Sequence, residues 1–541
     1  YQESSNTDAS SNTGYINPFY YARNMAPIYP VHAHDLTSDD GAYLLDGNGN
    51  IYYDEGTNRK QNIGRHVIWE LQDNMDKTYR TTLDGQAFMT FKFLKDFAFT
   101  VKGDLNVRHS ENQTYNNAVI GDGSGSNGRA ARTIYRYKNY TFQQQLTWNK
   151  SICNSNFDIL LGHENYSNHY NYQHAYKTNQ VYSGQTTLNN FTVMTDLTDY
   201  YADYRTESYL GRIKYNYDEK YYAELSFRRD GSSRFYQKNR WGNFWSLGGT
   251  WIVIKENFMK DVSWVNSLKL RASYGQVGND EGVGYYGYMA LYSLDQNAGK
   301  GAAYKTQNEA LNIQWETSSS WDLALEGRYF KMLDLNVEYF DKRSQNLLFD
   351  VQLPLSAGAT SSSSATASIT QNLGSIANKG VELDMNLDLI QNRNFRWSVN
   401  ANATFMKNVV VKLPEQNRVD GIVSGNFKYM EGHSIYDYYV YQYAGVDQMT
   451  GRCLYLPNTE DYYIGTPTDA NDTRKELDPN YLVEINGNYY TTYTTYAKKD
   501  WSGSVIPKVY GSFGTSLSWK NFTLSALFTY ALGGKTYDAS Y

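Results

Sequence analysis

The residue types that support catalysis or metal binding occur in this chain without the spacing that such chemistry needs. Residues 123–128 (GSGSNG) match the GxGxxG pattern of nucleotide-binding loops, but Arg129 and a tyrosine-rich segment follow where a helix should begin. We interpret them as a flexible loop. His163 and Glu164 would begin a zinc-protease motif, but its second histidine would fall at Ser167. No nucleophile has a recognisable partner base, so we predict no catalytic residues and no enzyme.

Two polar stretches near the start of the chain raise the question of a bound cation. Asp46, Asn48 and Asn50 have the spacing that opens a calcium loop, but Ile51 and Thr57 occupy the positions of its tight-turn glycine and bidentate glutamate. A looser calcium site that uses Asp54 or Glu55 remains as an alternative. His32, His34 and Asp35 could chelate a metal, although such a polar loop is more often solvated. The expectation is therefore no metal and no cofactor.

Clusters of tyrosine are better candidates for a binding function, because aromatic faces stack on sugar rings and nearby Asp, Asn and Gln bind hydroxyl groups. They lie in segments that we expect to be long loops. The alternative is that they pack the loops together or contact a partner protein. The substrate-binding candidates are Tyr166, Tyr170, Tyr172, Tyr176, Tyr285, Tyr286, Tyr288, Tyr438 and Tyr439.

The elements that must position these residues follow from residues 207–254. Tyr209, Gly211 and Ile213 alternate with Leu210 and Arg212, and the alternation resumes after a tight turn at residues 218–220. A period of two indicates a β-strand, so this stretch predicts a hairpin with one apolar and one polar face.

The same pattern recurs along the chain and predicts about 14 strands, where a strand that crosses a membrane needs about 9–11 residues. The paired segments are 91–93 with 97–107, 140–150 with 157–165, 241–254 with 268–275, 321–329 with 333–339, 381–389 with 395–403, and 509–519 with 522–530. Polar residues occupy every second position, which requires that face to be wet. The lumen-lining candidates are Arg212, Glu224, Asp334, Glu338, Asp384 and Asp388.

Short turns alternate with long connections at residues 110–132, 168–204, 276–312, 351–369 and 412–504. Short turns on one side and long loops on the other are typical of an outer-membrane barrel. Hydropathy does not contradict this, because every second residue of a barrel strand is polar. No apolar stretch reaches the ~18 residues of a transmembrane helix. We therefore predict an all-β fold, a transmembrane antiparallel β-barrel.

The composition of the chain limits the classes of molecule that it can bind. The net charge of -6 argues against nucleic acid, whereas the 53 tyrosines suit a lipid headgroup zone or sugar stacking. Cys153 and Cys453 fall in a short turn and a long loop, on opposite sides of the membrane, so we expect them to be unpaired.

Several blocks, in this order, resemble the SusC/RagA-like TonB-dependent outer-membrane transporters. They are NPFYYARNMAPIYP from Asn17, GRIKYNYDEKYYAELSFRRDGSSRF from Gly211, RWGNFWSLGGTWIVIKENF from Arg240, LKLRASYGQVGND from Leu268, GSIANKGVELDMNLDLI from Gly374, YAGVDQMTGRCLYL from Tyr443 and IPKVYGSFGTSLSWKNFTLSALFTYALGGKTYD from Ile506. The resemblance implies a 22-stranded barrel with an N-terminal plug and a TonB box. It also implies a SusD-like surface lipoprotein as a lid, and oligosaccharide substrates with oligopeptides as a second class.

On this basis we expect residues 1–76 to form an extracellular loop region and the start of the barrel, and residues 77–541 to form a partial barrel. The chain is then an internal piece of a longer protein, with the plug and the last strands outside it. The expected function is TonB-dependent import of oligosaccharides across the outer membrane of a Gram-negative bacterium. The alternatives are an oligopeptide importer of the same fold, a secreted β-rich adhesin or glycan-binding protein, and a passive porin.

Overall fold

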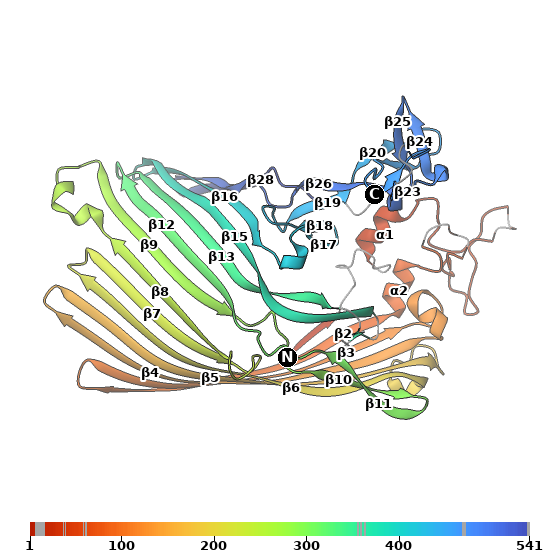
Figure 1. Ribbon diagram of the computed structural model, residues 1–541, viewed down its shortest axis with the longest axis horizontal. Coiled ribbons are helices and arrows are strands. Elements are labelled where there is room, and N and C mark those ends of the chain that lie inside the picture. Colours follow the sequence, from red (N-terminus) through yellow and green to blue (C-terminus); the bar gives the residue numbers. More distant parts are fainter. Residues whose placement is uncertain are drawn as a thin grey trace.

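The computed structural model is dominated by one antiparallel sheet that curls around an inner face (Figure 1). It describes all residues except 6–16, 36, 38, 58, 60–61, 354–355, 357–359, 362–363, 468–471 and 538–541. Of the sixteen strands in the sheet, β1 (Gln2–Ser5) and β14 (Thr360–Ser361) are short additions, which leaves the fourteen long strands that the sequence predicts. In sheet order these are β2 (Met75–Phe93), β3 (Phe97–Asn116), β4 (Arg129–Ile152), β5 (Ser155–Gln180), β6 (Phe191–Tyr217), β7 (Tyr221–Ser232), β8 (Trp241–Trp251), β9 (Val265–Asn279), β12 (Glu316–Tyr329), β13 (Leu333–Leu353), β15 (Ser364–Gln391), β16 (Phe395–Lys412), β27 (Val509–Trp519) and β28 (Phe522–Leu532).

Tight turns join these strands at one end of the sheet. Residues Asp218 and Glu219, between β6 and β7, have φ values of 54° and 49°. Two successive residues with positive φ reverse the chain with the twist that suits the flanking strands. Leu94 and Lys95 do the same between β2 and β3. The predicted hairpins are therefore confirmed, in continuous register with their neighbours.

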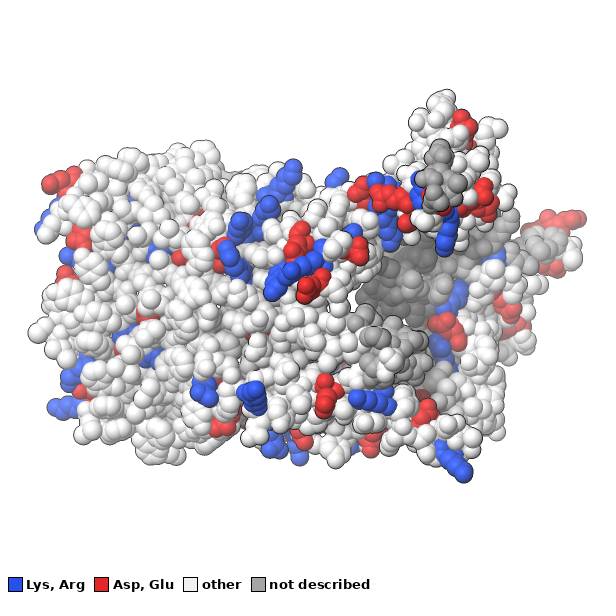
Figure 2. All heavy atoms as spheres, viewed as in Figure 1, with Lys and Arg blue, Asp and Glu red and all other residues white. Residues whose placement is uncertain are grey.

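The convex face of the sheet is apolar. Ile213, Leu225 and Leu247 lie side by side on β6, β7 and β8 and are 43%, 46% and 52% exposed. Nearer the tight turns, aromatic rings form a continuous chain from one strand to the next, with centroids 5.0–6.3 Å apart: Phe93, Phe97, Trp148, Phe157 and Tyr215. Figure 2 shows this surface as a broad region almost free of charge. An exposed apolar band bordered by aromatic rings is the outer surface of a membrane barrel.

The strands extend further than the alternation suggests. Most of residues 168–204, which we predicted to be a loop, belong to β5 and β6, which pair from Ser155 with Tyr217 to Gln180 with Phe191. The prediction fails here because both faces of the extended part are polar or aromatic. Residues 123–127, which we predicted to be a loop, lie in a 3-10 turn (Gly121–Ser126) and its left-handed end at Asn127. Part of the predicted connection 351–369 lies outside the described residues.

The remaining strands belong to the long connections. One hairpin, β10 (Leu291–Asn297) with β11 (Lys300–Gln307), lies between β9 and β12. The segment between β16 and β27 forms small sheets that stand apart from the main sheet (Figure 1). Their strands are β17 (Ile422–Ser424), β18 (Phe427–Tyr429), β19 (Asp437–Tyr441), β20 (Tyr443–Val446), β21 (Cys453–Tyr455), β22 (Tyr462–Tyr463), β23 (Lys475–Glu476), β24 (Leu482–Ile485), β25 (Asn488–Thr491) and β26 (Lys499–Ser504).

An ion pair in this segment gives a pH-dependent contact. The Asp472 carboxylate accepts hydrogen bonds from Arg474, which lowers the pKa of Asp472 from 3.8 to about 2. Arg474 also donates from Nη1 to the Thr459 carbonyl at 2.8 Å, beside the β22 and β23 pair. A lowered acid pKa stabilises the fold above its unfolded value. We therefore expect the contact to be intact at neutral pH and to be lost as the pH falls from 3.8 to about 2.

Hydrogen exchange of the Tyr462 and Lys475 amides in the full-length protein measures this change. The protection of these amides relative to their intrinsic exchange rates should fall in that pH window, and Asp472→Asn should show the low protection already at neutral pH. Equal exchange of the variant and the wild type at neutral pH would contradict the assignment.

The N-terminal region, before β2, contains two helices, α1 (Pro18–Asn24) and α2 (Val67–Asp73). Glu70 of α2 is 1% exposed and pairs with Arg65 at 2.8 Å; burial raises the pKa of Glu70. Arg65 also pairs with Asp122, in the connection between β3 and β4. This buried network fastens the N-terminal region to the sheet. Among the described residues, we find no helix that combines the length and hydropathy needed to cross a membrane.

Candidate functional site

A group of tyrosines lies on the concave face of β4, β5 and β6. Tyr170 pairs in register with Tyr137, and Tyr172 pairs with Tyr135 and Tyr200. The ring centroids of Tyr137 and Tyr170 are 4.8 Å apart, and those of Tyr172 and Tyr200 are 5.0 Å apart. The same parity carries Arg212 further along β6, so the tyrosines share the polar inner face.

A connection from elsewhere in the chain closes over this group. Tyr285, between β9 and β10, stacks on Tyr204 with centroids 5.5 Å apart and donates a hydrogen bond to Asn168 at 3.2 Å. The Arg234 guanidinium lies 4.6 Å and 5.1 Å from the centroids of the Tyr204 and Tyr285 rings. Asp280 fixes the position of Tyr204 by accepting its hydroxyl hydrogen bond at 2.9 Å. Together with the preceding rings these residues form what we call the tyrosine group: Tyr135, Tyr137, Tyr170, Tyr172, Tyr200, Tyr204 and Tyr285.

The tyrosine group surrounds a cavity of about 300 Å³, lined by Tyr137, Tyr170, Tyr200, Ala202 and Tyr285. A cavity of this size admits one ring of a sugar or one side chain. The sequence had indicated Tyr170, Tyr172 and Tyr285, but as residues of long loops. Tyr170 and Tyr172 are held instead by strand pairing in β5, whereas Tyr285 lies in a connection and is held by Tyr204, Arg234 and Asn168.

The other tyrosine candidates are dispersed. Tyr166 and Tyr176 lie on the same face of β5, toward its two ends, and Tyr166 contacts Tyr204. Tyr286 accepts a hydrogen bond from the Asp203 amide, and Tyr288 packs against the buried cluster around Phe235. Tyr438 and Tyr439 are in β19, where Tyr438 stacks on Phe427 and Tyr439 lies edge-on to Trp501.

Sequence reasoning missed Tyr135, Tyr137, Tyr200, Tyr204 and Arg234. A signal for four of them was present: they follow each other at spacings of two and four, as the inward positions of a strand do. Recognising this signal requires the register between β4, β5 and β6, which cannot be read from the sequence.

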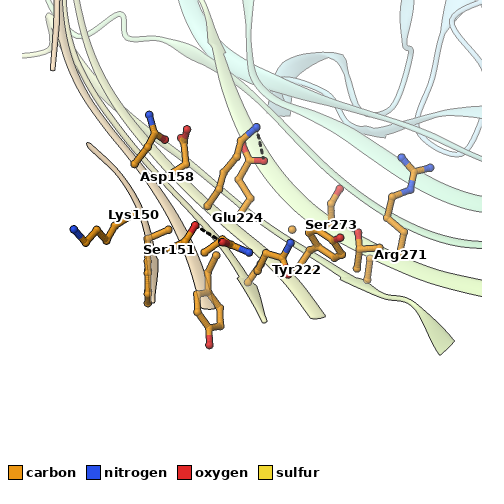
Figure 3. Close-up of a pocket in the computed structure, with 18 of the residues that line it drawn as sticks. Lys150, Ser151, Asp158, Tyr222, Glu224, Arg271 and Ser273 are labelled. Atoms are coloured by element: carbon orange, nitrogen blue, oxygen red, sulfur yellow. Dashed lines mark hydrogen bonds and ion pairs between the residues drawn. The ribbon is translucent and has the colours of Figure 1, made fainter. Parts of the chain in front are cut away.

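A second, larger cavity of about 960 Å³ lies on the inner face near the tight turns. Figure 3 shows four of the residues that line it: Asp158 of β5, Glu224 of β7, and Arg271 and Ser273 of β9. Arg212 pairs with Asp158 at 3.1 Å, and Lys214 with Glu224 at 3.6 Å. This cavity is polar and charged, in contrast with the tyrosine group.

Alternating charges continue along the inner face on β9, β12, β13 and β15. Arg271 pairs with Glu338 at 2.6 Å, and Arg328 pairs with both Asp334 and Asp388 at 3.2 and 3.3 Å. Asp384 lies opposite Asn336 of β13. The six lumen-lining candidates therefore share one face of the sheet.

The acidic residues considered for a calcium ion form hydrogen bonds and ion pairs within the chain. The Asp46 carboxylate accepts from the amides of Asn48 and Asn50, and Asp54 pairs with Arg59 at 2.6 Å. Glu55 accepts the Tyr52 hydroxyl, which raises the pKa of Tyr52 to about 12. No group of three or more His, Cys, Asp and Glu with the arrangement of a metal site occurs in the part of the chain that the structure describes. Both cysteines are free and exposed.

Comparison with known proteins identifies the family to which this architecture belongs. Residues 20–541 match the family model of the TonB dependent receptor-like β-barrel. TonB-dependent receptor P3 of Formosa agariphila is 27% identical over 525 residues, which cover 91% of this chain and 49% of that protein. TonB-dependent receptor SusC of Bacteroides thetaiotaomicron is 28% identical over 56% of this chain and 30% of its own. The chain thus spans about half the length, or less, of these curated relatives.

The fold also matches a solved structure, that of the RagAB peptide transporter, with a TM-score of 0.72 and 21% identity over 90% of this chain and 51% of that chain. At this identity the likeness concerns the fold. Together with the apolar outer band and the polar inner face, the family match settles the class. The chain belongs to the TonB-dependent receptor-like β-barrel family, resembles SusC and RagA within it, and is an outer-membrane protein of a Gram-negative bacterium and not an enzyme.

Proposed function

We propose that the intact protein imports an oligosaccharide across the outer membrane, driven through TonB and capped by a SusD-like lipoprotein. The family match and the likeness to SusC and RagA support this proposal. An outer-membrane location argues against the secreted adhesin. Import moves the substrate without making or breaking bonds, so it requires no cofactor from this chain.

The tyrosine group is the observation that favours a sugar. Its rings present aromatic faces on the inner wall of β4 to β6, and the C–H faces of sugars stack on such rings. Amides that can exchange hydrogen bonds with hydroxyl groups lie beside them: Asn168 donates to Asn139, which donates to Asn106. Rings and amides on a rigid strand wall form a site that is largely ordered before the substrate arrives.

An oligopeptide is the second candidate. The charged cavity near the tight turns, with Asp158, Lys214, Glu224 and Arg271, offers partners for the charged termini of a peptide. The fold is also similar to that of the RagAB peptide transporter. The two substrate classes thus depend on different parts of the inner wall, and they can be tested separately.

The test uses the full-length gene in its host. A deletion strain is grown with single polysaccharides or peptides as the sole nutrient, then complemented with the intact gene or with Tyr170→Ala/Tyr200→Ala. Removing two stacking rings should raise the glycan concentration needed for half-maximal growth by roughly tenfold, at about 0.5–1.5 kcal/mol per ring. Tyr201→Ala is the matched control, since Tyr201 adjoins Tyr200 but faces outward.

If the double variant restored growth at the same glycan concentration as the intact gene, the tyrosine group would not be the glycan-binding site. If the deletion strain failed to grow on peptides but grew normally on every glycan, the substrate would be a peptide and not an oligosaccharide. In that case, charge-neutral variants at Asp158 and Arg271 should impair growth on peptides.

A further inference from the structure

The outward rows of β13, β15 and β16 end in the same way. On β13 the row Leu333, Leu335, Val337 and Tyr339 is followed by Asp341 and Arg343. On β15 the apolar row ends at Val381 and the next outward residue is Lys379, and on β16 it ends at Phe405 and continues with Lys407. Three adjacent strands therefore place a basic residue just beyond the apolar band, at the end that carries the long connections. We call Arg343, Lys379 and Lys407 the basic triplet.

Two members of the basic triplet face each other directly. Lys379 and Lys407 are cross-strand partners in the register of β15 and β16, and both are exposed. Like charges in this position repel and destabilise a sheet. The carboxylate of Asp341, opposite Lys379 on β13, is occupied by Arg343, which donates to it from Nε and Nη2, each at 3.0 Å. One carboxylate against three cations leaves a local excess of positive charge.

The basic residues of the inner face are arranged differently. Lys214, Arg271 and Arg328 each pair with at least one carboxylate. Among the residues that the structure describes, Lys379 and Lys407 form no salt bridge. The Arg343 side chain remains 54% exposed although it is paired, whereas Asp341 is 5% exposed. The triplet thus presents exposed cationic groups just beyond the apolar band, with Asp341 as the one carboxylate that Arg343 and Lys379 share.

We propose that the basic triplet binds the phosphate group of an anionic lipid in the outer leaflet of the membrane. Arg and Lys are the residues that hold phosphate through charge-assisted hydrogen bonds, and a phosphate between Lys379 and Lys407 removes their repulsion. The lysine stems can lie along the apolar edge while their ammonium groups reach the headgroup. The lipid chain then runs down the outward surface over Phe405, which is 46% exposed, and Val381. Figure 2 shows Lys and Arg, with Asp and Glu among them, beside the uncharged surface.

The experiment measures lipid binding to the full-length protein in detergent by native mass spectrometry. The probe is a phosphatidic acid, with phosphatidylcholine of the same chains and inorganic phosphate as comparisons. A basic residue near a membrane surface contributes about a fivefold factor, so Lys379→Gln/Lys407→Gln should weaken phosphatidic acid binding by roughly 25-fold. Lys379→Arg/Lys407→Arg should retain it. The matched control is Lys95→Gln/Lys520→Gln, which removes two exposed lysines from the tight-turn end.

Unchanged binding in the Gln variant, or an equal loss in the control, would overturn the proposal. So would equal binding of phosphatidylcholine, which shows that the chains alone suffice. Competition by inorganic phosphate at equal concentration would identify a site for free anions instead of a lipid. Growth of the complemented deletion strain should not change, so this test is independent of the substrate proposal.

Discussion

Replacing Val337 with arginine is expected to destabilise the barrel by about 2–4 kcal/mol, the cost of a cation at the lipid-facing midplane. Val337 lies in the middle of the outward row of β13, between Leu325 of β12 and Leu383 of β15. Leu325 is 42% exposed on the apolar outer face. An arginine there has neither water nor a carboxylate within the row. The variant should unfold at lower urea concentration in lipid vesicles and reach the outer membrane in smaller amounts.

Asn336→Arg is the matched control, one residue away on the opposite face. Asn336 lies between Glu326 of β12 and Asp384 of β15, so an arginine there gains two carboxylate neighbours and faces a wet wall. We expect its stability to stay within about 0.5 kcal/mol of the wild type, as for most substitutions of exposed residues. If both variants lost the same stability, the two faces would not differ as described.

This contrast between adjacent residues explains how much of the fold the sequence predicts. A period of two assigns each residue of β13 to a face, because any slip by one position would send the Asp334, Asn336 and Glu338 row into lipid. The alternation therefore fixes the number of long strands and their pairing. The tight turns follow from the same register.

The alternation of polar and apolar residues predicts less of the candidate site. On β5 beyond Glu164, both faces carry tyrosine, asparagine or histidine, so alternation no longer distinguishes strand from loop. Backbone pairing with β4 and β6 continues the strand regardless. Tyr285 contacts Asn168 of β5, which lies 117 residues earlier in the chain. Arg234 contacts Tyr204 of β6, about thirty residues earlier. No local sequence pattern encodes such long-range contacts.

The second large effect concerns the backbone of β15. A Cβ added at Gly380 would lie far inside contact distance of the Phe405 carbonyl oxygen and 2.9 Å from the Phe340 ring. A flexible side chain could move aside, but this oxygen belongs to the paired strand β16. Gly380→Ala should therefore force the two strands apart locally and cost about 3 kcal/mol, at the upper end for overpacking. The urea unfolding midpoint of the full-length protein in vesicles measures this loss.

Gly248→Ala on β8 separates this clash from a general intolerance of alanine in the inner wall. Gly248 lies on the same inner face, and its added Cβ would meet the Ser273 Cβ at 3.8 Å, an ordinary contact. Alanine also restricts the unfolded chain, so this variant should be as stable as the wild type or more stable by about 0.4–1 kcal/mol. Equal midpoints for Gly380→Ala and Gly248→Ala would mean that β15 and β16 can separate at no cost. Since Lys379 and Lys407 are paired one residue away, a strand separation at Gly380 should also weaken lipid binding by the basic triplet.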